Sequence, residues 1–406
     1  MDDLVKKLNA GQKLLRRKDA SAVMGIKETH HALQRLSHLS DSELPHVVER
    51  SLFIGLYSTF DAFTGSLLLN IYKRKSQLFA ALQRTVPISE IVRHNSFKEL
   101  QDTVLRQELE DFRRKTYVDQ FKELEGTFGI KLREFEHWPD FVEAAQRRNL
   151  VTHCDLRITQ QYLEVCEREG FEFKQRPKVG EQLELGGKYF LRTCDIVSEV
   201  GLKLGQTLWR KVFPAELHKA DGELNAAIYD TLYIEHYPLA QVFGEFAVNQ
   251  KVVSSEVYRR MYAVNLAIAL KANGKAREAD EVLSKLDWSA CSLDFKLAEA
   301  VLRDRVADAC SIMKTIGKHA ELVKEESYHV WPLFSSFRLT PEFLKTYEEI
   351  YGRPFAVELQ KEADKKKETL VASTGKSSTN ASRLEENRDG TSALSAPHSR
   401  DRKPRA

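Results

Sequence analysis

The sequence is poor in the residues that interrupt helices. Its 406 residues include only 19 glycines and 11 prolines. Stretches in which apolar and polar residues alternate, as they do along a half-buried strand, are almost absent. The sequence therefore argues against a sheet-based fold and predicts an all-α protein.

Cysteine and net charge are also scarce. The five cysteines are odd in number, widely spaced and without a CxxC pair, so we expect reduced thiols rather than a disulfide framework. The first residues, "MDDLVKKLNAGQKLL", lack the apolar core of a signal peptide, which favours a cytoplasmic protein. The formal net charge of +3 is too small to indicate nucleic-acid binding by itself. Any such surface must come from local clustering of basic residues.

The most apolar run covers residues 51–72 and approaches the length of a membrane span. Asp61 interrupts this run, and its bulky residues recur at helical spacing. We therefore expect a buried, partner-facing helix over residues 43–74 and no membrane contact. The residues expected on its buried face are Val47, Val48, Leu52, Phe53, Leu56, Phe60, Phe63, Leu67, Leu68 and Ile71.

Capping and stop residues divide the rest of the N-terminal part into helices. Pro139 suits the first turn of a helix because its missing N–H would be unsatisfied there in any case. Thr159 can cap the next helix and Gly170 can end it. Other helices are expected over residues 2–17, 20–38, 98–126 and 188–212. The sequence thus predicts a first helical domain over residues 1–215, with a boundary near "FPAELHKADGE".

Two segments of the C-terminal half match each other at a constant offset. The matched pairs are Leu266 and Leu297, Ala267 and Ala298, Ala269 and Ala300, Ala276 and Ala307, and Val282 and Met313. Small alanines between larger aliphatic residues let two helices pack closely, which resembles tetratricopeptide-like hairpins; a generic helical bundle is the alternative. We expect a smaller helical-repeat-like domain over residues 216–356, closed by a helix pair in "WPLFSSFRLTPEFLKTYEEIYG". The polar composition of residues 357–406 predicts a disordered tail.

A polar motif stands out in "QRRNLVTHCD", which begins at Gln146. Asn149 and His153 are four residues apart and share one face of a helix, while Arg148 projects from the flank of that face. Apolar residues nearby supply the buried side of the same helix, so the polar trio must face solvent, a ligand or a second copy of the chain. A solvated helix face is the simpler interpretation.

The surrounding string, "WPDFVEAAQRRNLVTHCDLRITQQYL", resembles the motif region of the HEPN superfamily, in which Arg, a polar residue, spacers and His precede a turn and a helix carrying an aromatic residue such as Tyr162. The upstream "VERSLFIGLYSTFDAFTGSLL" resembles the long HEPN core helix with its embedded carboxylate. The resemblance covers about residues 45–205. It implies a HEPN helical bundle, followed in this chain by the smaller repeat-like domain and the tail.

The resemblance also implies a function. Many HEPN proteins are endoribonucleases that need neither metal nor cofactor, and their homodimers bring two Arg/His sets together in one cleft. Two-part chains of this kind resemble toxins or phage-defence effectors, so we expect RNA as substrate and an inhibitor or trigger protein that contacts the C-terminal helical domain. The alternative is a non-catalytic HEPN module that binds a nucleotide or RNA, or serves in protein assembly.

The chemistry of the motif suits RNA cleavage through the 2′-hydroxyl. That reaction needs a group that moves protons near neutral pH and a fixed cation that stabilises the extra charge on phosphorus. His153 is the candidate for the first role and Arg148 for the second. Asn149 is expected to orient the imidazole or to bind a phosphate oxygen.

Five further residues are candidates for supporting roles. Asp61 needs a polar partner, for which Arg148 is attractive, or else it lies at a helix cap or edge. Thr152, Asp155 and Tyr162 either line the cleft or serve as helix surface, turn residue and packing aromatic, the interpretation we prefer. Arg147 either contacts phosphate or is simply exposed. No metal site is expected, because His30, His31 and His38 are not joined by further ligands at a typical spacing.

Overall fold

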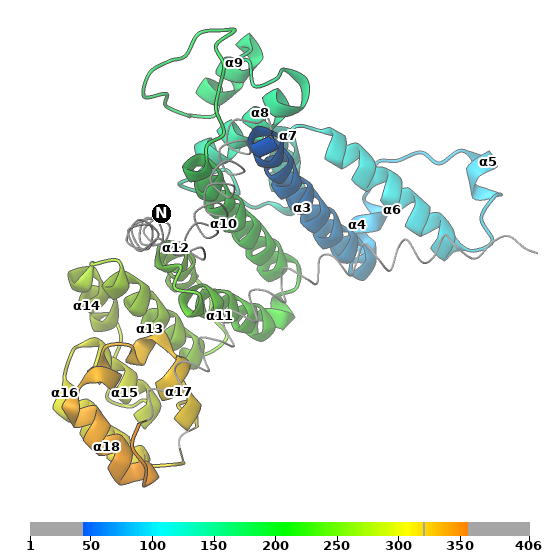
Figure 1. Cartoon of the computed structure of the whole chain (residues 1–406). Coiled ribbons are helices and arrows are strands. Elements are labelled where there is room, and N and C mark those ends of the chain that lie inside the picture. The colour runs from blue at the N-terminus through cyan, green and yellow to red at the C-terminus, as the bar shows by residue number, and fades with distance from the viewer. Residues whose placement is uncertain (1–43, 320, 356–406) are drawn as a thin grey trace, which may run out of the picture. The chain divides into compact units, whose positions relative to one another are not determined.

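The computed structural model describes residues 44–319 and 321–355 (Figure 1). Helices account for 72% of these residues. No strand occurs among them, and an isolated bridge pairs Arg157 with Gln182. The all-α prediction is therefore confirmed for the described part of the chain.

Some sequence predictions concern residues that the structure does not describe. The helices expected over residues 2–17 and 20–38, the three histidines of the first 43 residues and the tail predicted over residues 357–406 all lie outside the described ranges. The chain divides into two compact units, Met1–Ala220 and Asp221–Ala406, and each is considered by itself. The division falls inside one helix, α11 (Leu217–Tyr233).

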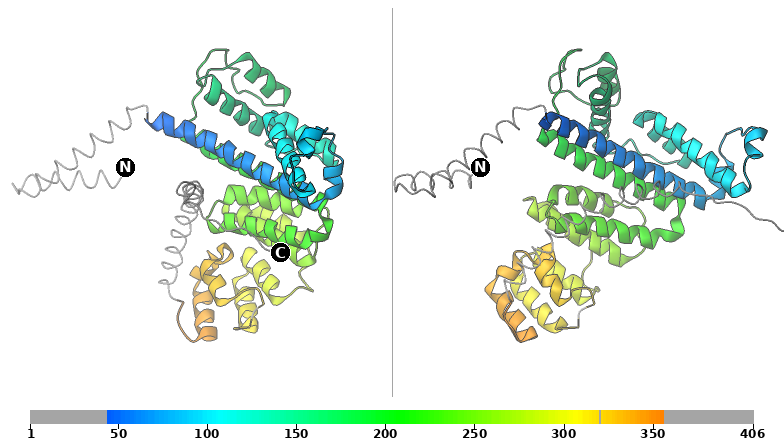
Figure 2. Two further views of the ribbon diagram at one scale, coloured as in Figure 1. Left: turned by 90° about the vertical axis from the view of Figure 1, so that its right-hand side faces the viewer. Right: turned by 45° about the vertical axis from the view of Figure 1, so that its right-hand side comes forward.

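The N-terminal unit is built around the long helix α3 (Leu44–Arg74), which packs against the short α4 (Ser76–Ala80) that follows it and against three longer helices of the unit. The three are α6 (Phe97–Arg114), α8 (Trp138–His153) and α10 (Gly187–Val212). Figure 2 shows α3 and α10 side by side along their length. Shorter helices complete the unit: α4 (Ser76–Ala80), α5 (Ile88–Ile91), α7 (Tyr117–Phe128) and α9 (Gln160–Arg168).

Aromatic side chains from three helices form the centre of this unit. Phe53, Tyr57 and Phe60 of α3 are buried; the rings of Tyr57 and Phe60 contact Phe141 of α8, which in turn contacts Phe121 of α7. Each such ring removes a large apolar area from water, and pairs of tilted or edge-on rings add a favourable electrostatic contact. The packing fixes α8, and with it the polar motif, against the middle of α3.

The apolar residues of α3 do not all face this core. Val47, Val48 and Leu52 are about half exposed, and Phe63 is 41% exposed, so the prediction that these four residues are buried is wrong for the isolated chain. The reason is that apolar residues surround the helix, and only one side of it meets other helices of the unit. Among the described helices, α3 is long and apolar enough to cross a membrane by length and composition, and 33% of its most apolar window is buried.

The sequence also predicts one charged helix over residues 98–126, where the structure has two helices. Lys115 adopts an extended conformation with φ −71° and ψ 156°, and α6 ends before it. Thr116 then caps α7, because its side-chain oxygen accepts a hydrogen bond from the backbone N–H of Asp119. A local cap thus interrupts a pattern that is otherwise continuous. This break places Tyr117 in the first turn of α7, where its side chain reaches α3.

Other predicted boundaries agree with the structure. Pro139 lies in the first turn of α8, and the Thr159 side chain caps α9 by accepting from the backbone N–H of Tyr162. Gly129 ends α7 in the left-handed conformation, with φ +60°. Gly170 follows the end of α9 with φ +88°, a value that favours glycine.

The C-terminal unit consists of short helices arranged as successive neighbours. After α11 come α12 (Tyr237–Val248), α13 (Glu256–Ala272), α14 (Ala276–Ser284), α15 (Leu293–Leu302), α16 (Val306–Ile316), α17 (Glu325–Val330) and α18 (Pro341–Tyr351). Helix α13 packs against α12 and α14, and α16 packs against α15 and α18. The pairs Leu266 and Leu297, Ala267 and Ala298, and Ala269 and Ala300 are all buried. Three of the five matched pairs therefore lie in the core of this unit, whereas Ala276 and Ala307 are exposed and Val282 is half-buried.

The end of this unit differs from the prediction of a closing helix pair. The segment contains two short 3₁₀ turns, Pro332–Phe334 and Phe337–Leu339, and only then the α-helix α18. Proline at the first position of each of two elements, Pro332 and Pro341, cannot donate a backbone hydrogen bond and prevents one continuous helix. Buried aromatic rings, Phe334, Phe337 and Phe343 among them, hold the turns in place instead.

Candidate functional site

The polar motif occupies the last two turns of α8. Phe141, Val142 and Ala145 on this helix are buried in the core of the N-terminal unit, and Leu150 belongs to a smaller cluster with α9. Four consecutive motif positions, 146 to 149, run from buried to half-buried, and Thr152 and His153 are exposed. The motif therefore passes from the protein interior at its start to solvent at its end.

The charge of Arg148 acts on a carboxylate of α3 and on its hydrogen-bond partner. The Tyr117 hydroxyl donates a hydrogen bond to Oδ1 of Asp61 over 2.7 Å. The charge of Arg148 acts on both of these groups. Side chains from α3, α7 and α8 thus form one electrostatic cluster, which we call the Asp61 cluster (Asp61, Tyr117 and Arg148). The hydrogen-bond partner of Asp61 is Tyr117, and no ion pair between Asp61 and Arg148 is found among the described residues, so the pairing of Asp61 with Arg148 stays a prediction.

Titration of the Asp61 cluster reflects its burial. Burial raises the pKa of Asp61, while the Tyr117 hydrogen bond and the charges of Arg148 and Arg113 act to lower it. Burial and the neighbouring carboxylate also raise the pKa of Tyr117, so its hydroxyl remains protonated and donates to Asp61 at neutral pH. Arg148 therefore belongs to a cluster in which burial disfavours the negative charge of Asp61.

The guanidinium of Arg148 is incompletely paired. Its Nη1 donates to Oδ1 of Asn149 over 3.3 Å. Its Nε is buried and has no hydrogen-bond partner among the described residues. A buried donor without a partner is uncommon and costs free energy, so an acceptor from a bound ligand would be favourable here.

A second arginine approaches the cluster over a glycine. A Cβ atom added to Gly65 would lie 1.8 Å from a terminal nitrogen of Arg113, which shows that the Arg113 side chain crosses α3 where that helix has no side chain. Arg113 belongs to the last turn of α6, and its charge acts on Asp61. Glycine at position 65 therefore lets a cation lie close to the Asp61 cluster.

His153 is the last residue of α8 and is exposed. Five residues separate it from Arg148, which corresponds to about 140° around the helix axis. No hydrogen bond to its imidazole is found among the described residues. Thr152 is also exposed, and its hydroxyl donates to the backbone carbonyl of Arg148 over 2.9 Å. Within one chain, the arginine and the histidine of the motif do not converge on one point.

Asp155 marks the turn after α8. Its backbone has φ +48°, and its carboxylate forms an exposed ion pair with Arg50 of α3, with 2.6 Å between Nη1 and Oδ1. Gln182 donates to its backbone carbonyl over 2.6 Å. The role as a turn residue, preferred from the sequence, agrees with this geometry. The ion pair also places the N-terminal half of α3 next to the end of α8 that carries His153.

Arg147 and Tyr162 belong to a buried network that the sequence analysis missed. Glu143 of α8 is 2% exposed. Its Oε1 accepts hydrogen bonds from Nε of Arg147 over 2.9 Å and from the Tyr162 hydroxyl over 2.6 Å. Its Oε2 accepts from the Tyr189 hydroxyl over 2.7 Å. We call these four residues the Glu143 network.

Two candidate site residues, Arg147 and Tyr162, take part in the Glu143 network. The guanidinium of Arg147 stacks on the ring of Tyr189 at 3.9 Å and also donates to the carbonyl of Glu184. Its side chain is only 14% exposed, so the expectation of an exposed arginine is wrong. Tyr162 is 1% exposed and packs inside the unit. One sequence signal pointed to the network: Glu143 and Arg147 are spaced as an i, i+4 ion pair.

Comparisons with known proteins add no identification: no family model, no curated protein and no solved structure matches the chain. Within the described residues, no group of three or more His, Cys, Asp or Glu side chains is arranged to hold a metal ion. The site is therefore characterised by its own geometry, with Arg148 and Asn149 half-buried on α8 and with His153 exposed at the end of the same helix.

Proposed function

We propose that the chain is a metal-independent endoribonuclease of the HEPN type, which cleaves RNA by attack of the 2′-hydroxyl on the adjacent phosphate. The observation that carries the proposal is the environment of Arg148. The charge of Arg148 acts on Asp61 of the long core helix, its buried Nε has no hydrogen-bond partner among the described residues, and an exposed histidine follows five positions later.

In this proposal Arg148 binds the scissile phosphate. Arginine stays charged at all relevant pH values, and its planar fork matches two phosphate oxygens. Asp61 and Asn149 position the guanidinium, and Arg113 supplies a second cation near the same place. His153 transfers protons, since its imidazole is exposed and accessible to a bound ribose. No metal or cofactor takes part in the proposed reaction.

A homodimer is part of the same proposal, because the motif is incomplete in one chain. Leu44, Val47, Val48 and Leu52 form an exposed apolar face on the first half of α3, each between 46% and 54% exposed. The ion pair between Arg50 and Asp155 brings the N-terminal half of α3, which carries this face, next to the end of α8. A second copy that covers the face would bring its own motif near the first one. Burial of such apolar area is the ordinary driving force for association.

Control of the activity is a further part of the proposal. Unrestrained RNA cleavage would harm the cell that contains it, as in the toxins and phage-defence effectors that two-part HEPN chains resemble. We assign contact with an inhibitor or trigger protein to the C-terminal unit. A cytoplasmic location follows from RNA as the substrate.

The second candidate is a non-catalytic module that binds RNA or a nucleotide. It is favoured by the absence of any group that orients the His153 ring among the described residues, because a catalytic base is usually held by a third group. In that case Arg148 would hold a phosphate without cleavage.

The test is cleavage of total RNA by the purified full-length chain in excess EDTA, with analysis of the product ends. We expect 2′,3′-cyclic phosphate ends, with about 10²- to 10³-fold loss in Arg148→Ala and about 10²- to 10⁴-fold loss in His153→Ala. Matched controls are Arg277→Ala and His319→Ala, which change exposed residues of the C-terminal unit and should leave cleavage unaffected.

Circular dichroism and thermal melting show whether each variant is folded. Cleavage at the same rate in His153→Ala would rule out the catalytic role of this residue. Binding of labelled RNA without cleavage, weakened in Arg148→Ala and unchanged in His153→Ala, would favour the binding module instead.

A further inference from the structure

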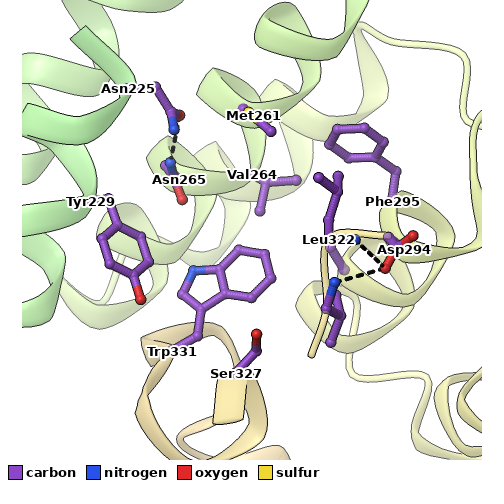
Figure 3. A pocket seen from close by; sticks show the side chains of 12 residues that line it. Asn225, Tyr229, Met261, Val264, Asn265, Asp294, Phe295, Leu322, Ser327 and Trp331 are labelled. Atoms are coloured by element: carbon purple, nitrogen blue, oxygen red, sulfur yellow. Dashed lines mark hydrogen bonds between the residues drawn. The ribbon is translucent and has the colours of Figure 1, made fainter. Parts of the chain in front are cut away.

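A cavity of about 250 Å³ lies within the C-terminal unit (Figure 3). Its walls come from alternate helices of the array, namely α11, α13, α15 and α17, and from the loop before α17. In arrays of helical hairpins, one helix of each pair lines a continuous face, and such faces serve as extended binding surfaces. The lining residues are Asn225, Tyr229, Met261, Val264, Asn265, Asp294, Phe295, Ala298, Leu322, Val323, Ser327 and Trp331.

The cavity contains a buried hydrogen-bond donor without a partner. The indole Nε1 of Trp331 is inaccessible to solvent and makes no hydrogen bond with the described residues. In the view of Figure 3, the indole lies among the lining side chains, with its nitrogen turned to the side on which Tyr229 and Asn265 lie. Because a buried N–H without an acceptor is unfavourable, this group calls for a ligand that carries an acceptor.

Two asparagines in the cavity wall present amide groups that can pair with a peptide group. Nδ2 of Asn265 donates to Oδ1 of Asn225 over 3.0 Å. This bond leaves Oδ1 of Asn265 as an acceptor and Nδ2 of Asn225 as a donor, with no other hydrogen bond to either atom in the described part of the chain. A carboxamide pair with one free donor and one free acceptor complements a peptide group, which also has one of each.

The charges around the cavity exclude an anionic ligand. Among the described residues that line the cavity there is no Lys, Arg or His, and the one charged side chain is Asp294. Its Oδ1 accepts from the backbone N–H groups of Leu322 and Val323, over 3.3 and 2.8 Å. RNA and nucleotides require cations near their phosphates, and the lining supplies none. Apolar and aromatic walls formed by Tyr229, Val264 and Phe295 favour an uncharged, apolar group instead.

We infer that this cavity binds a bulky uncharged side chain of a polypeptide segment from a partner protein. The side chain packs between the apolar walls, the Trp331 N–H donates to a main-chain carbonyl of the segment, and the Asn225–Asn265 pair meets a neighbouring peptide group. This inference concerns the C-terminal unit and stands whether or not the N-terminal unit cleaves RNA.

The test follows the indole N–H resonances of the ¹⁵N-labelled full-length chain during titration with N-acetyl-phenylalaninamide. The Trp331 resonance is assigned with the variant Trp331→Phe. N-acetyl-phenylalaninamide has about 15 non-hydrogen atoms, for which ordinary ligand efficiency gives a Kd on the order of 1 mM. We expect a saturable shift of the Trp331 resonance with such a Kd, and none at Trp138, Trp209 or Trp288.

Two further probes test the chemistry. N-acetyl-glycinamide, which lacks the side chain, should bind at least about tenfold more weakly, because it buries far less apolar area. Adenosine monophosphate should give no saturable shift of the Trp331 resonance, because the lining has no cation for its phosphate. A saturable response to the nucleotide equal to that of the phenylalanine probe would overturn the inference.

Two variants test the location. Val264→Phe fills the cavity and should abolish the response, and Asn225→Leu removes the amide edge and should weaken binding by at least about tenfold. Unchanged resonances of the other tryptophans, Trp288 of the same unit above all, show that each variant is folded. The inference fails if the wild-type resonance does not respond at ten times the expected Kd, or if both folded variants respond like the wild type.

Discussion

The Glu143 network allows a quantitative prediction about which arginine of the motif is structural. Glu143 is 2% exposed and accepts hydrogen bonds from Arg147, Tyr162 and Tyr189. In Glu143→Gln the shape of the side chain is nearly kept, but the charge of Arg147 remains in the interior without its counter-charge. Removing one partner of a buried ion pair costs about 3 to 5 kcal/mol of unfolding free energy.

Hydrogen exchange measured by mass spectrometry is the suitable assay, because it reports on each helix of a two-unit chain separately. A loss of about 3 to 5 kcal/mol raises the exchange rate of core amides in α8 and α9 by about 10²- to 10⁴-fold, since each 1.4 kcal/mol corresponds to a factor of ten. The control is Glu164→Gln, which changes an exposed glutamate of α9 and should alter stability by less than about 0.5 kcal/mol.

A double variant separates the ion pair from simple loss of packing. Glu143→Leu combined with Arg147→Met removes both charges and keeps apolar volume beside the Tyr189 ring, on which Arg147 stacks. The double variant should therefore be more stable than Glu143→Leu alone, and it should retain RNA cleavage if Arg147 does not contact substrate. Exchange in Glu143→Gln within tenfold of the wild type, or strictly additive costs in the double variant, would refute the reasoning.

Three further predictions concern other sites. Burial raises the pKa of Asp61 above its usual value, so folding favours the neutral carboxyl, and stability declines as pH rises through the pKa of the folded state. Asp61→Asn should therefore raise the melting temperature at pH 7 and still reduce RNA cleavage. A lower melting temperature would contradict this. Burial lowers the pKa of His329, so its contribution to stability is present above the unfolded pKa of about 6.5 and is lost as pH falls through the pKa of the folded state. His329→Gln should therefore reduce the loss of stability of the C-terminal unit between pH 7.5 and 5.5. An unchanged pH dependence in melting curves would exclude this role of His329. Leu52→Asp places a charge on the exposed apolar face of α3 and should dissociate the proposed dimer in sedimentation experiments. The control Thr59→Asp, at another exposed position of α3, should have a smaller effect. A wild-type mass for Leu52→Asp would argue against this interface.

Helix positions followed from the sequence wherever the signals were local. The apolar periodicity of α3 predicted a helix over residues 43–74, and the structure has Leu44–Arg74. Pro139 and Thr159 marked the starts of α8 and α9, because a missing N–H and a side-chain acceptor act within one turn of the chain. The motif on α8 was visible for the same reason, since residues four apart share a face of any helix.

The surroundings of that motif were decided by tertiary structure. No spacing in the sequence indicates that Tyr117 reaches Asp61, because the two lie 56 residues apart and meet only when α7 packs against α3. Arg147 and Arg148 are adjacent and chemically identical, yet the helix turns one toward the buried Glu143 and the other toward Asp61. The sequence by itself determined an all-helical chain with one polar motif. Which of its charges are buried, paired or left facing solvent depended on the packing of helices that are distant in sequence, since burial and ion pairing are properties of the assembled core.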